Sequence, residues 1–366
     1  MKSYKLRRNL TKTRHTVRSV AALNEGPWRW AVGIQAGIAI GVPVALFTLS
    51  GYPSFGLIAS LGGFTVLYGV SRPPADRLKI LPFVAIGLIL SSILGVVCAF
   101  SEWLTAIYLI VLTVVTSFIS FGIRLGPPGP VMFILVAAIS SRLAAPSSSG
   151  GASISGDLIP LLIMTGAILA LLVVVASSVL PFMRDAPPAE AEPEPGWKIQ
   201  LDKETSQIVI RVIAGVTVAI LVSKPLGIQR AYWVVVAVCA ILQAGQNRQL
   251  TTVRAIQRVL GTLLGVVVFQ LLILLKPTGA WIILIIMLFQ FATQVVIARN
   301  YVLGLIFITP IALMNTMVGR IGVLVPVRER ILDTLLGAGI ALVVFWIEEL
   351  ISRQSTVDGQ QSVTRE

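Results

Sequence analysis

The chain has 366 residues, of which 56% are hydrophobic and only 12% are charged. Soluble globular proteins carry about 25% charged residues, so this composition excludes an ordinary soluble enzyme. The formal net charge of +13 has two interpretations: basic residues that orient membrane loops, or a preference for anionic ligands. Because these basic residues are spread among apolar runs without interleaved aromatic side chains, we expect no nucleic-acid partner.

Few residues could support catalysis or hold a metal. Cys98 and Cys239 both lie inside apolar runs, and His15 is the only histidine of the chain. An Asp-rich cluster of the kind that binds Mg²⁺ through diphosphates is also missing from the sequence. We therefore expect no disulfide, no metal site, no cofactor and no enzymatic activity.

The N-terminal segment, residues 1–27, is basic. Its apolar residues recur at roughly helical spacing between lysines and arginines in "KLRRNLTKTRHTVRSVAAL". One interpretation is an interfacial helix held to anionic lipid, at about 1 kcal/mol per basic residue. The other is a disordered tail that only fixes the orientation of the first span.

Apolar runs of about 20 residues recur along the rest of the chain, each long enough for a membrane-spanning helix. The first six lie at 30–50, 54–70, 80–100, 103–122, 129–145 and 157–182. The second six lie at 205–223, 231–246, 256–275, 279–298, 300–317 and 330–351. Between them, "MRDAPPAEAEPEPGWK" has the composition of a solvated linker. The prediction is an all-α polytopic membrane protein with repeats at 28–183 and 205–351, a linker at 184–204, and a tail at 352–366.

Basic residues favour a topology with both termini in the cytoplasm, because an even number of spans returns the chain to its starting side. The loop "GRIGVLVPVRER" is the exception, since it puts Arg320, Arg328 and Arg330 outside. Either the last two spans are drawn wrongly, or the loop forms an external basic vestibule.

The two halves resemble each other in sequence order. "SSILGVV" at 91–97 matches "GTLLGVV" at 261–267, and "GAILALLV" at 166–173 matches "GAGIALVV" at 337–344. "RWAVG" with Gly33 similarly matches "RVIAG" with Gly215. Since each repeat contains an even number of spans, we expect parallel repeats related by a pseudo-two-fold axis normal to the membrane.

One helix of the second half combines arginines with small residues. At 100° per residue, Arg254, Arg258, Gly261 and Gly265 lie within a stripe of roughly 60°. Glycines four residues apart permit close helix packing, so the arginines face protein or a water-filled crevice rather than lipid. They either anchor the helix end at the headgroups or form an inward-facing anion site.

Arg211 lies about 9 Å inside its apolar run, as judged from six residues at 1.5 Å each. A buried arginine requires a partner or a function. The candidates are an ion pair with Asp333 or Glu204, or direct contact with an anionic substrate.

Other polar residues within the runs could join helices by hydrogen bonds or contact a substrate. Among them, Asp333 alone could carry a proton, so it is a candidate for proton coupling or for a structural ion pair. The candidate substrate residues besides the arginines are Gln243, Gln290 and Gln294.

Residues 230–268, "RAYWVVVAVCAILQ" followed by a polar turn and "TVRAIQRVLGTLLGVVV", resemble the signature of the fusaric acid resistance (FUSC) family of bacterial inner-membrane exporters. Arg258, Gly261, Thr262 and Gly265 stand at its signature positions. Plant aluminium-activated malate transporters look like distant relatives of one such half. The resemblance implies export of aromatic or other organic acids, commonly coupled to protons, across the bacterial inner membrane.

The leading hypothesis is therefore a proton-coupled exporter of organic anions. The alternatives are a passive anion channel and a non-transporting scaffold in envelope assembly. Expected partners are the organic anion and membrane lipid, with a homo-oligomer and a periplasmic adaptor left open. Many family exporters have a sizeable cytosolic domain where this chain has only the Pro/Glu linker.

Overall fold

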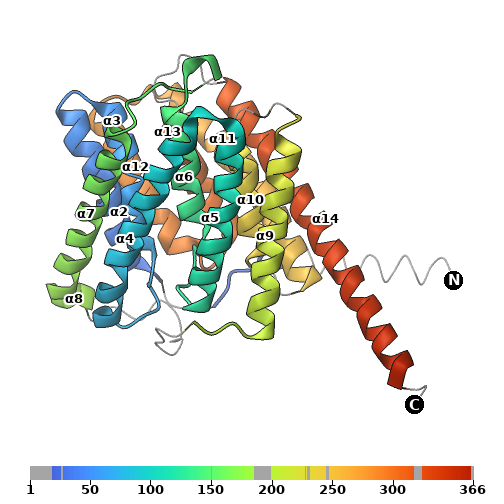
Figure 1. Ribbon diagram of the computed structural model, residues 1–366. Helices are drawn as coiled ribbons and strands as arrows, with labels where there is room; N and C mark the ends of the chain where they lie inside the picture. The colour runs from blue at the N-terminus through green and yellow to red at the C-terminus, as the bar shows by residue number, and fades with distance from the viewer. Residues whose placement is uncertain are drawn as a thin grey trace.

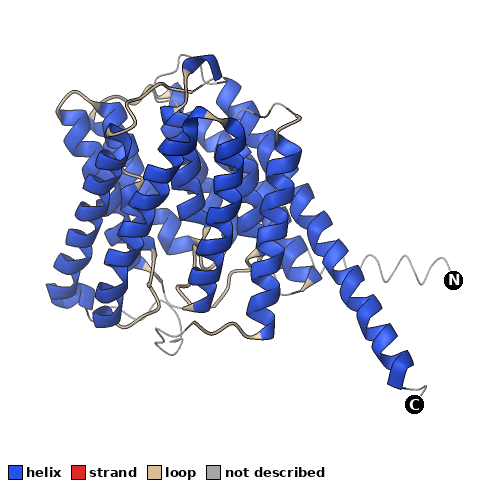
Figure 2. Cartoon of the chain, in the orientation of Figure 1, coloured by secondary structure: helices blue, strands red, loops and turns tan. Residues whose placement is uncertain are grey.

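The computed structural model describes residues 19–25, 28–149, 151–184, 199–226, 228, 231–244, 247–316 and 324–363. Within these ranges every regular element is helical (Figure 2). The N-terminal residues 1–18, which hold most of the segment interpreted either as an interfacial helix or as a disordered tail, and the linker residues 185–198 lie outside the described part of the chain.

Within the described residues, seven helices are long and apolar enough to cross a membrane. Their bounds are α2 Trp30–Leu49, α4 Pro74–Val97, α5 Glu102–Gly122, α7 Leu158–Val179, α9 Lys203–Ser223, α11 Arg248–Leu274 and α14 Leu324–Val363. The apolar part of α14 ends near Ile351, and its last turns extend away from the bundle (Figure 1).

Five of the predicted runs form shorter apolar helices. They are α3 Pro53–Ala59 with the 3₁₀ helix η1 Gly62–Leu67, α6 Val131–Ala144, α10 Ala231–Leu242, α12 Ala280–Val296 and α13 Tyr301–Thr316. Three minor elements join the set: η2 Cys98–Phe100, η3 Ser147–Ser149 and α8 Pro181–Arg184. Each predicted run thus contains a helix, and membrane crossing by these five stays a prediction.

The helices pack as a single bundle in which the two halves share long seams (Figure 1). In the first half α4 packs on α6 and α7, and in the second half α11 packs on α13 and α14. Between the halves α2 packs on α12, α5 on α9, and α6 on α10. Large apolar side chains remain exposed on the outer faces of α4, α5, α7 and α11, as expected for surfaces that face lipid.

Glycines set the closest helix contacts, because a Cβ at these positions would meet backbone of the neighbour. A Cβ at Gly261 would lie 2.9 Å from the carbonyl oxygen of Val302, and one at Gly265 would lie 2.8 Å from that of Leu305. The face of α11 that carries Gly261 and Gly265 is therefore closely packed. The neighbour that packs there is α13.

A buried arginine donates hydrogen bonds to backbone carbonyls in the interrupted helical segment between α3 and the start of α4. Arg77 Nη2 donates to the carbonyl oxygen of Val66 at 2.6 Å, and its Nε donates to that of Tyr68 at 3.1 Å. Its Nη1 donates to Oε1 of Gln35 at 2.9 Å. The carbonyls at the end of a broken helix need such donors when no water reaches them, so Arg77 stabilises the fold.

Candidate functional site

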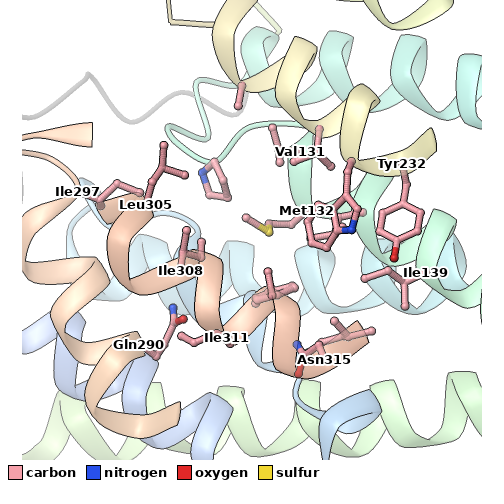
Figure 3. Close-up of a pocket in the computed structure, with 18 of the residues that line it drawn as sticks. Val131, Met132, Ile139, Tyr232, Gln290, Ile297, Leu305, Ile308, Ile311 and Asn315 are labelled. Carbon is pink, nitrogen blue, oxygen red and sulfur yellow. The ribbon is translucent and has the colours of Figure 1, made fainter. Parts of the chain in front are cut away.

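A cavity of about 380 Å³ lies between the two halves of the bundle (Figure 3). Its walls come from α3, η1 and α6 of the first half and from α10, α11, α12, α13 and α14 of the second half. Figure 3 shows Val131 and Met132 from α6 together with Leu305 and Ile308 from α13 around this space. A volume of this size is typical of small-molecule sites.

The cavity is elongated along the helices. Its lining residues run from Val131 to Leu143 on α6, a length of about 18 Å at 1.5 Å per residue. On α13 they run from Tyr301 to Asn315, about 21 Å by the same rule. We call the two extremities the Tyr301 end and the Asn315 end. A cavity of this length covers most of the thickness of a bilayer core, which is about 30 Å.

Every charged residue that lines the cavity, within the described part of the chain, is an arginine. The set consists of Arg29, Arg142, Arg254, Arg258 and Arg330. No Asp or Glu is among the described lining residues. Positive groups in a largely apolar enclosure, with no acidic side chain among its described lining residues, favour an anionic ligand.

Arg254 and Arg258 enclose a tyrosine at the Tyr301 end. The guanidinium of Arg254 lies 3.4 Å from the centroid of the Tyr301 ring. Arg258 donates from Nη1 to the Tyr301 hydroxyl at 2.6 Å. The Nε atoms of Arg254 and Arg258 are buried and have no hydrogen-bond partner among the described residues. Both side chains therefore keep donor capacity for a ligand.

Arg330 of α14 is the least satisfied arginine of the cavity. Its residue is 2% exposed, and its guanidinium lies 3.7 Å from the Trp233 ring centroid. Both Nε and Nη1 are buried without a hydrogen-bond partner in the part of the chain that the structure describes. A buried guanidinium with two empty donors is costly unless an acceptor arrives, so Arg330 is suited to binding a carboxylate.

The rest of the wall is largely apolar, with a few amides. Gln243, Gln290 and Asn315 line the cavity, and Gln290 is 2% exposed. Aliphatic residues of α6 and α13 separate these amides. Such a wall accommodates the hydrocarbon part of an organic anion while the arginines hold its charge.

The structure brings four of the predicted substrate residues to this cavity: Arg254, Arg258, Gln243 and Gln290. Gln294 and Arg211 are not among the residues that line it. Arg211 is absent because it lies on α9, and no described residue of α9 lines the cavity.

Arg211 is paired with a residue that the sequence analysis did not consider. Its Nε and Nη2 both bind the carboxylate of Glu348 on α14, the second at 2.9 Å, and its guanidinium lies 4.6 Å from the Phe345 ring centroid. The sequence analysis named Asp333 and Glu204 as the candidate partners instead. The i, i+3 spacing of Phe345 and Glu348 explains the geometry, because it puts a ring and a carboxylate on one face of α14.

The other predicted positions lie outside the cavity lining, and the glycines among them lie at helix contacts. Gly33 lies against Phe291 of α12, and Gly215 lies against Val238 and Leu242 of α10. Thr262 is 1% exposed, between Gly261 and Gly265 on the face that meets α13. Asp333 is 3% exposed and lies one turn beyond Arg330 on α14, outside the cavity lining.

Sequence reasoning missed Tyr301, Trp233 and Arg142 as cavity residues. It treated Arg330 as part of a basic external loop. The signal for Arg330 was present, since Arg330, Asp333 and Gly337 follow each other at helical spacing. Helix α14 already includes Arg330, so the last span begins earlier than the predicted position 330.

The segment before α2 closes over the Tyr301 end. The carbonyl oxygen of Val20 accepts hydrogen bonds from Gln257 at 3.2 Å and from Asn300 at 3.0 Å. Asn24 donates from its backbone nitrogen to the carbonyl oxygen of Arg299 at 2.8 Å. Arg29, which follows this segment, lines the cavity.

Comparison with known proteins agrees with the sequence signature. Residues 212–344, from α9 to α14, match the family described as "Fusaric acid resistance protein-like". The curated "Uncharacterized membrane protein YvaC" of Bacillus subtilis (strain 168) is 33% identical over 132 residues, which are 36% of this chain and 21% of that protein. The chain thus matches about a fifth of its relative's length. No solved structure matches the chain.

Proposed function

We propose that this chain, whose residues 212–344 match the fusaric acid resistance protein-like family, transports organic anions, most favourably aromatic carboxylates, through the arginine-lined cavity. Arg330 carries this proposal, since it is buried with two donor nitrogens that lack a partner among the described residues. Arg254 and Arg258 bind the same class of ligand at the Tyr301 end. Trp233 and Tyr301 offer ring faces beside the guanidinium groups.

We further propose that the chain lies in a bacterial inner membrane, with both termini in the cytoplasm and net export as its task. Basic residues in the loops favour that orientation.

The two-repeat architecture belongs to the same proposal. Equivalent helices of the halves have equivalent partners: α4 with α6 and α7, and α11 with α13 and α14. Gly166 of α7 faces the carbonyl oxygen of Ala59, and Gly337 of α14 faces that of Val234. The first helix of each half, α2 or α9, packs on the fourth helix of the other half, α12 or α5. A two-fold rotation that exchanges the halves would therefore exchange these two seams. These correspondences support parallel six-helix repeats with the cavity between them.

The test is flux of benzoate into vesicles that contain the purified chain. Arg330→Gln removes a charged donor worth about 1.5–3 kcal/mol, so we expect the apparent affinity to fall about 10–100-fold. Arg330→Lys keeps the charge without the planar fork and retains part of the activity. Arg328→Gln, on the exposed side of the same helix, is the matched control. Unchanged benzoate affinity in Arg330→Gln would remove the cavity from the mechanism.

We propose Asp333 as the residue that couples flux to protons. Its charge acts on Arg330, one turn away. When Asp333 is protonated, its negative charge no longer offsets the positive charge of Arg330. Proton binding at Asp333 therefore favours anion binding at Arg330, and by linkage anion binding favours protonation to the same extent. Asp333→Asn should remove the stimulation of flux by a pH gradient, whereas the exposed Asp157→Asn should keep it. Full stimulation in Asp333→Asn would exclude it as the coupling group.

A passive anion channel is the second candidate, because the cavity extends along most of α6 and α13. Planar-bilayer recording separates the two functions. Unitary currents that do not depend on a pH gradient favour the channel. Flux that depends on the gradient, without unitary currents, favours the transporter. A wild-type chain with neither behaviour would favour a scaffold.

A further inference from the structure

A second, smaller cavity adjoins the first. It has a volume of about 190 Å³ and lies between α5, α6, α9 and α10. Arg142 and Tyr232 line both cavities, so these two side chains form the partition between them. We call the smaller cavity the side chamber.

The side chamber has the chemistry of an anion site. Arg142 and Lys224 line it, and so do Ala231 and Tyr232 at the start of α10, where a helix end carries partial positive charge. The hydroxyl of Ser223 is fully buried in its wall and has no hydrogen-bond partner among the described residues. Such a hydroxyl can donate to a bound carboxylate.

The acidic residue of the side chamber, Glu102, lies at its rim. Its side chain is 76% exposed, and it pairs with Lys224 at 3.7 Å. The Lys224 ammonium also lies 3.9 Å from the Trp103 ring centroid. Solvent reaches the exposed Glu102 carboxylate and weakens this pair, so a carboxylate inside the chamber can compete for Lys224.

The opposite seam between the halves, formed by α2 and α12, has close contacts at its glycines. There, a Cβ on Gly37 would meet the carbonyl oxygen of Met287 at 3.0 Å, and one on Gly41 would collide with the Met287 side chain. Helices α2 and α12 are therefore closely packed, whereas the α5–α9 seam contains a chamber lined by hydroxyl groups.

We propose that the side chamber is a second anion station, through which a carboxylate passes between the large cavity and the outside of the bundle. Arg142 contacts the anion on both sides of the partition, and Lys224 and Ser223 hold it in the chamber. This inference rests on the proposed function, because a second station has a role only if the large cavity carries anions.

Charge-selective thiol labelling tests the inference. The background is the full chain with Cys98→Ala and Cys239→Ala, into which Ser223→Cys reports on the side chamber and Ile308→Cys reports on the large cavity. The probes are the anionic 2-sulfonatoethyl and the cationic 2-(trimethylammonium)ethyl methanethiosulfonates. Each rate is divided by the rate with 2-mercaptoethanol, so that intrinsic reactivity cancels.

We expect the anionic probe to label Ser223→Cys at least about tenfold faster than the cationic probe after this correction, and benzoate to slow it. Lys224→Gln should lower that preference at Ser223→Cys and leave it intact at Ile308→Cys. Lys203→Gln, at the exposed start of the same helix, is the matched control. Ala231→Cys replaces Ser223→Cys if that variant does not fold.

The outcomes separate the two proposals. An anionic preference at Ile308→Cys with none at Ser223→Cys or Ala231→Cys overturns the side chamber and keeps the proposed function. No anionic preference at Ile308→Cys counts against the proposed function itself. Loss of the chamber preference in Lys203→Gln would also overturn the inference, because it would reflect general surface charge.

Discussion

The arginines of this chain differ in how completely their donors are used. Arg77 gives three hydrogen bonds inside the bundle, and Arg211 binds both oxygens of Glu348. Arg330 makes no hydrogen bond from Nε or Nη1 to any described residue. A guanidinium that is already paired has little to offer a ligand, whereas one with empty donors gains by binding an acceptor. This difference separates structural arginines from the candidate ligand-binding ones.

At the residue scale, Arg211 can be tested as a structural residue. Arg211→Leu leaves the Glu348 carboxylate unpaired, and Arg211 is 5% exposed while Glu348 is 30% exposed. We expect a loss of stability of about 1–3 kcal/mol, between the values for surface pairs and for fully buried pairs. The double variant Arg211→Leu/Glu348→Leu should recover most of it in thermal unfolding.

Benzoate flux provides the second measurement on these variants. Flux per folded molecule should persist in both, because Arg211 does not line the cavity. Abolished flux in a stably folded double variant would indicate that Arg211 takes part in transport.

At the element scale, close packing of α11 on α13 positions Tyr301 and Ile308 in the cavity wall. Gly265→Val adds side-chain atoms where a Cβ already lies 2.6 Å from the Thr309 Cβ. Overpacking of this kind costs about 1–3 kcal/mol, so the midpoint of thermal unfolding should fall by several degrees.

Helix α14 provides the control for this substitution. A Cβ on Gly339 meets nothing within 4 Å. Gly339→Ala should therefore be neutral or stabilising by up to about 1 kcal/mol, since alanine has the higher helix propensity. Equal destabilisation by both substitutions would contradict the role assigned to the α11–α13 contact.

Hydropathy and helical periodicity predicted the elements of this fold well, and their limits are physical. The spacing of Arg254, Arg258, Gly261 and Gly265 identified the packed face of α11 because it depends only on one helix. The partner of Arg211 could not be found this way, since Glu348 is 137 positions away in the sequence. Trp233 and Arg330 meet only after α10 and α14 have packed together.

The same reasoning explains why the candidate site was predicted only in part. Arg254 and Arg258 lie near the start of an apolar run, where a buried arginine stands out in the sequence. Arg330 follows a stretch rich in charge and proline, so the sequence pattern resembled a loop. Its burial comes from tertiary contacts with α10, which no local pattern records.

At the scale of the whole molecule, the cavity requires both halves. Arg142 comes from the first half and Arg254, Arg258 and Arg330 from the second, across seams formed by α2–α12 and α5–α9. These seams bury apolar and small side chains, which stabilises association without a covalent link. Separate chains of residues 1–190 and 191–366 should therefore co-purify when expressed together.

Co-expressed halves should also transport benzoate, and neither half should do so alone, because neither one encloses the cavity. Gly37→Leu in the first half is the seam variant, since its side chain would enter the position of Met287. It should reduce co-purification measured with a tag on one half, whereas Gly51→Ala, in a turn with nothing within 4 Å of its Cβ, should alter the seam little. Transport by a single half would mean that the anion path lies within one repeat rather than between two.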